Sequence, residues 1–230
     1  EQTNLLEERY KSHTETRELF SVSSQHYAFV VNAFVSLLKR ADMTRYELFL
    51  RETRTYEIIE DVKNFRSEIG VLFLNSYNRD VLTKMFDDNR LTYTSLFKAR
   101  PHIFVSKSNP LAKHEVVSLE DLEDFPYLSY DQGIHNSFYY SEEILSQIPH
   151  KKSIVVSDRA TLFNLLIGLD GYTIATGILN SNLNGDNIVS IPLDIDDEID
   201  IVYLKHEKAT LSKMGEKFLD NLVKEVTFDN

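Results

Sequence analysis

Apolar and polar positions along the chain change their period repeatedly, and each change marks an expected element. In the first third, strand-like runs at 18–22, 46–50 and 68–74 alternate with helix-like segments at 25–39 and 55–65. The run EIGVLFL at 68–74 is continuously apolar, as expected of a strand buried on both faces. This strand–helix–strand order predicts a parallel sheet wrapped by helices.

The same order begins again after a strand-rich middle section. Further strands are expected at 91–97, 101–107, 127–130, 152–157, 171–176, 187–193 and 198–205, and helices at 136–147, 158–169 and 211–226. A short helix is expected after Ser118, which precedes Asp121 at capping-box spacing. Asp158 is expected to act as the N-cap of the helix that it begins.

Two α/β lobes joined by two crossings of the chain follow from this pattern. We expect the first crossing near 129–131 and the return through 192–197. The first lobe would then hold 17–128 and 198–230, and the second 129–197. Two lobes joined in this way form a hinged cleft, where small molecules commonly bind.

Composition narrows the classes of partner. The formal net charge is −11 and no Lys/Arg-rich run occurs, so the chain should repel a phosphate backbone and is not expected to clamp nucleic acid by itself. There is no cysteine, which excludes disulfides, thiol catalysis and Cys-ligated zinc. The densest apolar stretch, 27–38, falls short of the roughly 20 residues of a membrane span, so no membrane contact is expected.

Polar residues recur where strands end and helices begin. In a parallel sheet, ligands bind beyond the carboxyl ends of strands, where helix N-termini offer free N–H groups and a partial positive charge. Every such residue has a plainer interpretation as a helix cap, and only their repetition at successive junctions favours a ligand site. The residues at these junctions are Ser24, Gln25, Thr53, Thr55, Asp131, Gln132, Ser157 and Thr176.

Charged residues near the junctions are less informative. Arg54, Arg100 and Arg159 could each pair with a ligand carboxylate, but ordinary surface arginine is the simpler interpretation of the first two. His26 is expected to be packed or exposed, and Glu142-Glu143 to be solvated surface.

Evidence for an enzyme is weak. The chain lacks a G-x-S-x-G elbow, a P-loop, a dinucleotide fingerprint and an H-x-x-x-H pair. We therefore expect no catalytic residue, no metal site and no cofactor.

The helix expected at 25–39 is apolar on nearly all sides. Of residues 27–38, only Asn32 and Ser36 are polar. Such a helix must be covered on both sides. Burial within the monomer and contact with a second subunit explain the pattern equally well.

Several segments together resemble the effector-binding region of LysR-type transcriptional regulators. They include VSSQHYAFVVNAFVSLLKR, the Thr-x-Glu-Ile helix start at 55–58, EIGVLFL, the NPLA…SLEDL segment at 109–122, and GYTIAT at 171–176. Asn109 stands where histidine is common, and Gly171-Tyr-Thr-Ile replaces the usual Gly-x-Gly-Ile. The resemblance covers nearly the whole chain.

The resemblance implies an α/β fold of two Rossmann-like subdomains, periplasmic-binding-protein-like (type 2), with a hinged cleft. It implies a homodimer through helices 25–39 and 136–147 and allows a higher oligomer in the full-length protein. It also implies that 1–16 is the end of a linker helix, that DNA is bound only through a winged helix-turn-helix head absent from this sequence, and that the protein is cytoplasmic. The effector contacts that it implies are Ser24, Gln25, Thr53, Thr55, Ser157 and Thr176, with Asp131 and Gln132 at the crossing.

The sequence therefore predicts the ligand-sensing domain of a transcriptional regulator. We expect a small anionic or zwitterionic metabolite, such as one from amino-acid or sulfur metabolism, to bind between the subdomains. Two alternatives share the two-lobe scaffold, namely a solute-binding protein of a transporter and an enzyme.

Overall fold

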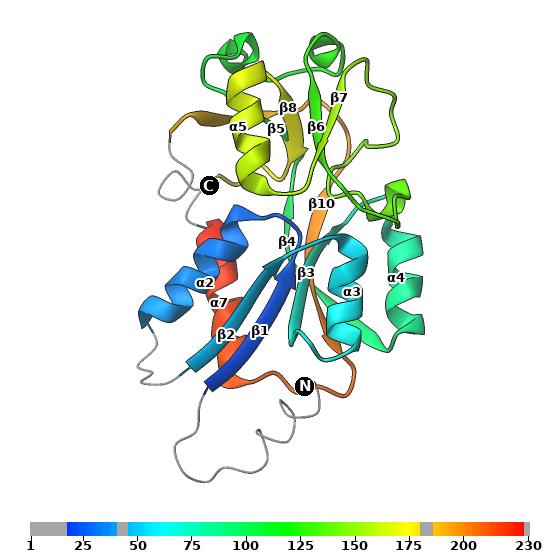
Figure 1. Ribbon diagram of the computed structural model, residues 1–230, viewed down its shortest axis with the longest axis vertical. Coiled ribbons are helices and arrows are strands. Elements are labelled where there is room, and N and C mark those ends of the chain that lie inside the picture. Colours follow the sequence, from blue (N-terminus) through cyan, green and yellow to red (C-terminus); the bar gives the residue numbers. More distant parts are fainter. Residues whose placement is uncertain (1–17, 41–45, 180–185, 228–230) are drawn as a thin grey trace.

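Two five-stranded sheets lie one above the other along the long axis of the molecule (Figure 1). The computed structural model describes residues 18–40, 46–179 and 186–227. The linker helix expected at 1–16 lies outside the described residues. Within them, no helix is long and apolar enough to cross a membrane.

The first sheet has the strand order β2-β1-β3-β10-β4. Strand β1 pairs in parallel with β2 and β3, whereas β10 runs antiparallel to β3 and β4. The strands are β1 (Glu18–Ser24), β2 (Tyr46–Glu52), β3 (Ile69–Leu74), β4 (Leu91–Ala99) and β10 (Ile199–His206). The helices on this sheet are α2 (Ala28–Arg40), α3 (Thr55–Lys63), α4 (Arg79–Asp88) and α7 (Lys213–Thr227).

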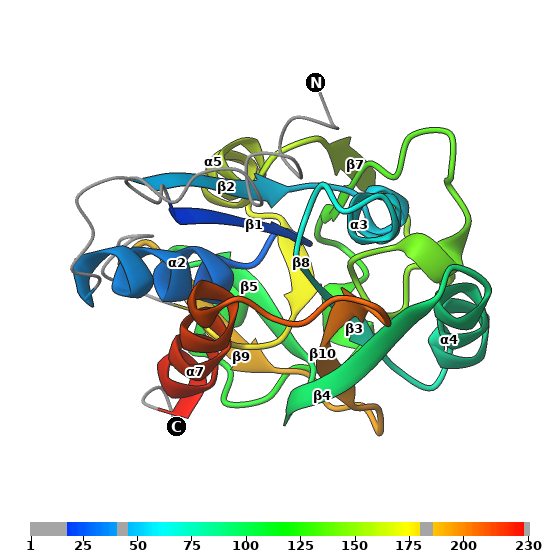
Figure 2. The ribbon, with the colours of Figure 1, turned by 90° about the horizontal axis from the view of Figure 1, so that it is seen from below.

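Both faces of the first sheet are covered, which explains the unbroken apolar run of β3. Val71 and Phe73 belong to the core beneath α2 and α7, whereas Leu72 and Leu74 belong to the core beneath α3 and α4. Figure 2 shows the two helix pairs on opposite sides of the sheet. Because side chains alternate along a strand, a strand covered twice needs apolar residues at every position.

The second sheet has the order β7-β6-β8-β5-β9 and a simpler cover. The helix α5 (Arg159–Leu169) packs on one face through Leu162 and Leu166. The side chain of Asp158 accepts a 2.8 Å hydrogen bond from the Thr161 N–H, which confirms the expected N-cap. The strands are β5 (His102–Ser106), β6 (Tyr127–Tyr130), β7 (Ser153–Val156), β8 (Tyr172–Ala175) and β9 (Ile188–Pro192).

The first crossing between the lobes differs from its expected position. The chain enters the second sheet between β4 and β5, at 100–101, rather than near 129–131. It returns between β9 and β10, at 193–198. The reason for the difference is that β5 pairs with β8 and β9, a long-range choice that local sequence does not encode.

The prediction of a helix at 136–147 is wrong. Within 131–149, only Phe138–Tyr140 forms a 3-10 turn, and the other residues are irregular. We call the whole segment 131–149 the strap. Its aromatic side chains contact the first lobe: His135 stacks on Tyr56 and Tyr139 stacks on Tyr77. These tertiary contacts override a local preference for helix.

Helix α4 was missed by the pattern of apolar residues. Its sequence RDVLTKMFDD buries only Leu82 and Phe86, one turn apart. Two buried positions in ten residues give too narrow a stripe to be recognised from periodicity.

Candidate functional site

The carboxyl ends of β1 and β3 and the start of α3 meet at the boundary between the lobes. Gln25 lies at their centre and is fully buried. Its Nε2 donates to Thr55 Oγ1 at 2.6 Å, while its Oε1 accepts from the Tyr27 hydroxyl at 2.6 Å and from the Phe73 N–H at 3.0 Å. Ser24 Oγ donates to the Gln25 carbonyl at 2.8 Å. The predicted residues Ser24, Gln25 and Thr55 are therefore together, but they bind one another.

Gln132 extends this arrangement across the lobe boundary. Its Oε1 accepts from the Thr55 N–H at 3.1 Å, and its Nε2 donates to Glu142 Oε1 at 3.0 Å. Arg54, the N-cap of α3, supplies no side-chain cap, so the first N–H of the helix is satisfied by the opposite lobe. Free N–H groups at a helix start often bind an anionic ligand, but here the side-chain amide of Gln132 takes that position at the start of α3.

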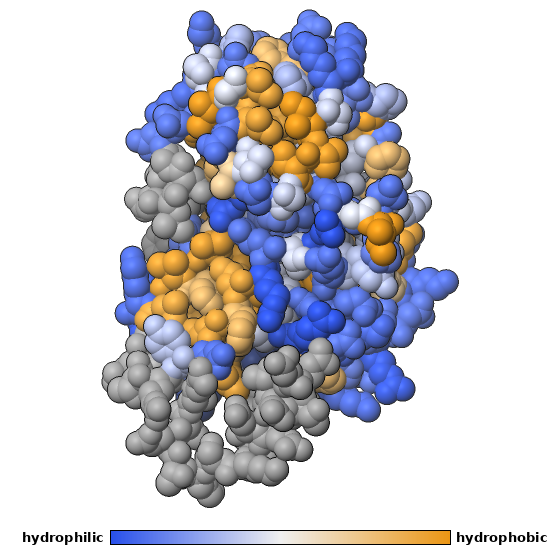
Figure 3. All heavy atoms as spheres, in the orientation of Figure 1, coloured by the Kyte–Doolittle hydropathy of each residue, from blue (hydrophilic) through white to orange (hydrophobic). Residues whose placement is uncertain are grey.

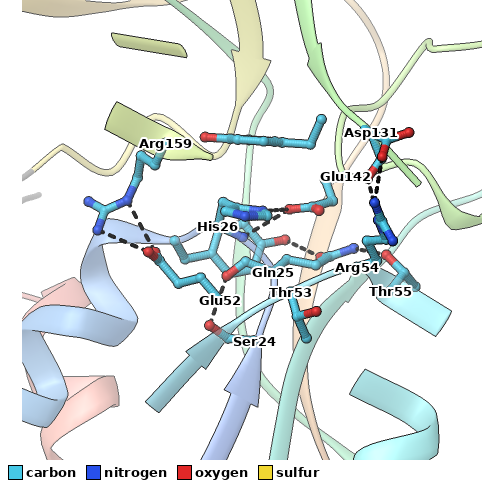
Figure 4. Close-up of polar contacts among 12 residues, drawn as sticks. Ser24, Gln25, His26, Glu52, Thr53, Arg54, Thr55, Asp131, Glu142 and Arg159 are labelled. Carbon is cyan, nitrogen blue, oxygen red and sulfur yellow. Dashed lines mark hydrogen bonds and ion pairs between the residues drawn. The ribbon is translucent and has the colours of Figure 1, made fainter. Parts of the chain in front are cut away.

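A second bridge joins His26 to Glu142 in the strap (Figure 4). Glu142 Oε2 accepts hydrogen bonds from the His26 N–H at 2.9 Å and lies 2.8 Å from His26 Nδ1. The imidazole also stacks on the Tyr130 ring at a centroid distance of 4.1 Å. Burial by itself would lower the pKa of His26, but the hydrogen bond and negative charge of Glu142 outweigh it, and the pKa is raised above 6.5.

Two arginine–carboxylate pairs close the boundary on either side. Nε of Arg159, at the start of α5, lies 3.1 Å from Oε1 of Glu52 (Figure 4). On the other side, Nη2 of Arg54 lies 2.6 Å from Oδ2 of Asp131. The N–H of Gly133 and then the Arg54 guanidinium lower the pKa of Asp131. Both arginines thus pair with protein carboxylates from the opposite lobe.

The remaining predicted residues are dispersed. Thr53, which precedes α3, donates a hydrogen bond to Glu57 of that helix, and Ser157 is exposed. Thr176 is buried and lines a pocket between the lobes. Of the eight predicted residues, only Thr176 belongs to the wall of this pocket, whereas Ser24, Gln25, Thr55 and Gln132 form the network beside it.

The pocket encloses about 640 Å³, counted out to its open mouth. The residues that line it come from both lobes, chiefly from the segment after β1, from α5, from β8 and from the strap. The aromatic side chains that line it are Tyr27, Phe29, Phe73, Phe104, Tyr130 and Phe163. The polar side chains are His26, Glu142, Glu143, Arg159, Thr173 and Thr176.

Glu142 and Glu143 were missed as site residues, and their expected place on the solvated surface is wrong. Their exposed fractions are 8% and 4%. The neighbouring sequence FYYSEEIL gave a signal, because an acidic pair between aromatic and aliphatic residues is unusual for open surface. His26 is packed, as the sequence favoured, with its ring stacked on Tyr130, and it also lines the pocket.

The arrangement can bind a small molecule but offers no evident metal site. Among the described residues, no group of three or more His, Cys, Asp or Glu side chains could hold a metal ion. The pocket combines apolar walls with a few convergent polar groups, as ligand pockets usually do.

The bond between His26 and Glu142 predicts a pH-dependent coupling between the lobes. Because folding raises the pKa of His26, its contribution is complete below about pH 6.5 and is lost as the pH rises through the higher folded-state value. A double-mutant cycle with His26→Gln and Glu142→Gln should give a coupling of about 0.5–3 kcal/mol at about pH 5.5 and a smaller one at about pH 9. Urea unfolding measures each term, and a coupling that grows with pH would contradict this assignment.

Comparisons with known proteins identify a family and similar folds. The family described as the LysR substrate binding domain matches residues 23–227. A search of curated proteins finds no match. Solved structures of similar fold include a LysR family transcriptional regulator from Pseudomonas aeruginosa, at 14% sequence identity and a TM-score of 0.60. The matched region covers 97% of this chain and 76% of that chain.

Two further structures contain ligands. The effector binding domain of QuiR in complex with shikimate has 16% identity and a TM-score of 0.59, over 91% of this chain and 97% of that chain. The BenM effector binding domain with its effector benzoate has 15% identity and a TM-score of 0.62, over 94% and 95%. These likenesses confirm the expected fold class, two Rossmann-like subdomains of the periplasmic-binding-protein type 2 kind. With a family match over most of its length, the chain belongs to the LysR substrate binding domain family.

Proposed function

We propose that this domain senses a small metabolite bound in the pocket between its two sheets. The observation that carries the proposal is that one pocket is lined by residues of both lobes and by the side chains that join them. His26 comes from the first lobe, Glu142 and Thr176 from the second, and all three line it. A ligand placed there would contact the groups that hold the lobes together.

Transmission of the signal would follow from this placement. A ligand shifts an equilibrium only when it binds two arrangements with different affinity. A molecule that competes for Glu142 would weaken the hydrogen bonds of Glu142 to His26 and Gln132. Because Gln132 also caps α3 at the Thr55 N–H, that cap would weaken too. The change in lobe geometry would then alter how a full-length regulator holds DNA.

Precedent favours a compact metabolite. The QuiR and BenM domains were solved with shikimate and benzoate, both small ring compounds. By analogy, we propose an effector of similar size, contacting Thr176 directly and resting on the network of Ser24, Gln25, Thr55 and Gln132.

The two alternatives have less support. A solute-binding protein shares the fold, but the family match is to the regulatory domain. An enzyme would need a catalytic group set, and the described pocket presents its histidine bound to a carboxylate rather than to a nucleophile. We propose a non-enzymatic regulator that works in the cytoplasm, where its DNA would be.

Filling the pocket should abolish sensing. Thr176→Phe places a large ring in the pocket wall, whereas Thr94→Phe makes the same change on exposed β4. We expect a panel of amino acids, amines and small carboxylates to contain a compound that raises the melting temperature of the wild type and of Thr94→Phe but not of Thr176→Phe. Equal shifts in all three proteins would place the ligand elsewhere.

We also propose a homodimer, with one change to the surfaces expected from the sequence. Because 136–147 is not a helix, its place as partner of α2 falls to α5, the described helix of the second lobe. Figure 3 shows one apolar area over α2 and β2 and another over α5, separated by a polar band. A second copy turned head to tail would cover both areas at once, as a two-fold interface requires.

Exposed apolar side chains on β2 and α5 provide the test. Phe49 on β2 is 37% exposed and Ile167 on α5 is 42% exposed. Phe49→Glu and Ile167→Glu should each convert the dimer to monomer in sedimentation velocity, because a charge would be buried in an apolar contact. Val116→Glu, on an exposed apolar residue that belongs to none of β2, α2 and α5, should remain dimeric. A monomeric wild type, or dimers of all variants, would contradict the proposed interface.

A further inference from the structure

One buried carboxylate of the pocket is only half satisfied. Glu143 Oε1 accepts a 2.9 Å hydrogen bond from the Tyr130 N–H. Its Oε2 is buried and has no hydrogen-bond partner within the described parts of the chain. Glu143 also lines the pocket. A buried carboxyl oxygen without a hydrogen-bond partner is costly whether or not it carries the proton, unless a ligand supplies the partner.

Positive charge in the pocket, by contrast, is already paired. The cationic side chains that line it in the described structure are Arg159 and His26. Arg159 faces Glu52 at 3.1 Å, and His26 faces Glu142 at 2.8 Å. A ligand carboxylate would therefore have to displace a protein carboxylate from one of these cations. It would also lie close to Glu142 and Glu143, whose acidic side chains line the pocket.

The rest of the wall suits an apolar body. Phe29, Phe73, Phe104 and Phe163 line the pocket together with Ile144 and Ile178. Aromatic rings pack well against such side chains, whereas a strongly hydrated ligand would lose its water without replacement.

We propose that the effector is an amine: its ammonium group donates to Glu143 Oε2 while an aromatic or aliphatic body lies against the phenylalanine wall. The inference rests on the proposed sensing function and narrows its ligand class. Of the two classes expected from the sequence, it retains a zwitterion, whose carboxylate would point to the pocket mouth, and disfavours a bare anion.

Amine binding should also release a proton from Glu143, which gives a second test of this inference. Burial and then the neighbouring charge of Glu142 raise the pKa of Glu143 well above its usual value, which favours the neutral carboxylic acid when no cation lies beside it. Other titratable groups that sense Glu143 are Tyr27, Tyr127 and Tyr130, and burial raises the pKa of each. When an ammonium ion binds, Glu143 gives its proton to solvent and becomes the carboxylate of an ion pair, and the ammonium keeps its own.

A matched series of three probes isolates the charge. The compounds 2-phenylethylamine, 2-phenylethanol and phenylacetate share one apolar body and differ in the terminal group. Calorimetry near neutral pH should show the amine binding at least about tenfold more tightly than either of the others. Glu143→Gln should remove this preference, and Glu120→Gln, the same change at an exposed site, should preserve it.

Proton release is measured on the wild type alone and so does not depend on a variant that folds. Amine binding in phosphate and in HEPES, neither of which carries a primary amine, should give heats that differ in proportion to the ionisation enthalpies of the two buffers, with release of up to one proton. Tight binding of phenylacetate or 2-phenylethanol would overturn the amine class and leave small-molecule sensing intact. Absence of amine binding, or amine binding unchanged in Glu143→Gln, would also overturn it, while the metabolite panel with Thr176→Phe decides the sensing function separately.

Discussion

Buried polar groups between the lobes must find hydrogen-bond partners, and this requirement organises the molecule. Gln25, Thr55, Gln132, Glu142 and His26 form one continuous chain of hydrogen bonds that passes from β1 through α3 into the strap and back. No member could separate from its neighbour in a dry boundary without leaving a donor or acceptor unpaired, at a cost of about 1–3 kcal/mol. The two lobes therefore adopt one relative position while the boundary remains dry.

The strap explains why this network can respond to a ligand. A regular helix at 136–147 would hold its carboxylates by backbone geometry, but an irregular segment holds them by the contacts that its side chains make. It contacts the first lobe through aromatic stacks such as His135 on Tyr56, through the hydrogen bonds of Gln132 and Glu142, and through the Arg54–Asp131 pair. A ligand that changes the partners of Glu142 or Glu143 thus acts on the contacts that fix the strap. Segments held by few regular backbone bonds are the ones that rearrange most readily.

Charge placement follows the same logic. The chain carries a net charge of −11, yet its cleft pairs nearly every cation with a carboxylate from the opposite lobe. The exposed Arg54–Asp131 pair orients the lobes more than it adds stability, because exposed ion pairs contribute little. The unsatisfied oxygen of Glu143 is the exception, and Glu143 lines the same pocket as the phenylalanine side chains.

Much of the fold could be predicted from periodicity, because the covered sheets need continuous apolar strands such as 69–74 and amphipathic or apolar helices such as α7. The membership of β5 in the second sheet could not, since strand pairing across 70 residues of chain depends on the whole fold. The sequence predicted residues beside the candidate site rather than its lining. Ser24, Gln25, Thr55 and Gln132 do converge, but they form hydrogen bonds with one another. Glu142 and Glu143 escaped prediction because their burial is a property of the strap, whose path is set by contacts with the other lobe.

The backbone amide of Thr55 reports most directly on the central claim that one lobe caps a helix of the other. Residue-resolved hydrogen exchange in the wild type should show this amide protected, although it stands at a helix start where amides normally exchange fast. In Gln132→Ala the account predicts that this protection is lost while the amides of β3 keep theirs. An unprotected Thr55 amide in the wild type, or equal protection in Gln132→Ala, would contradict it.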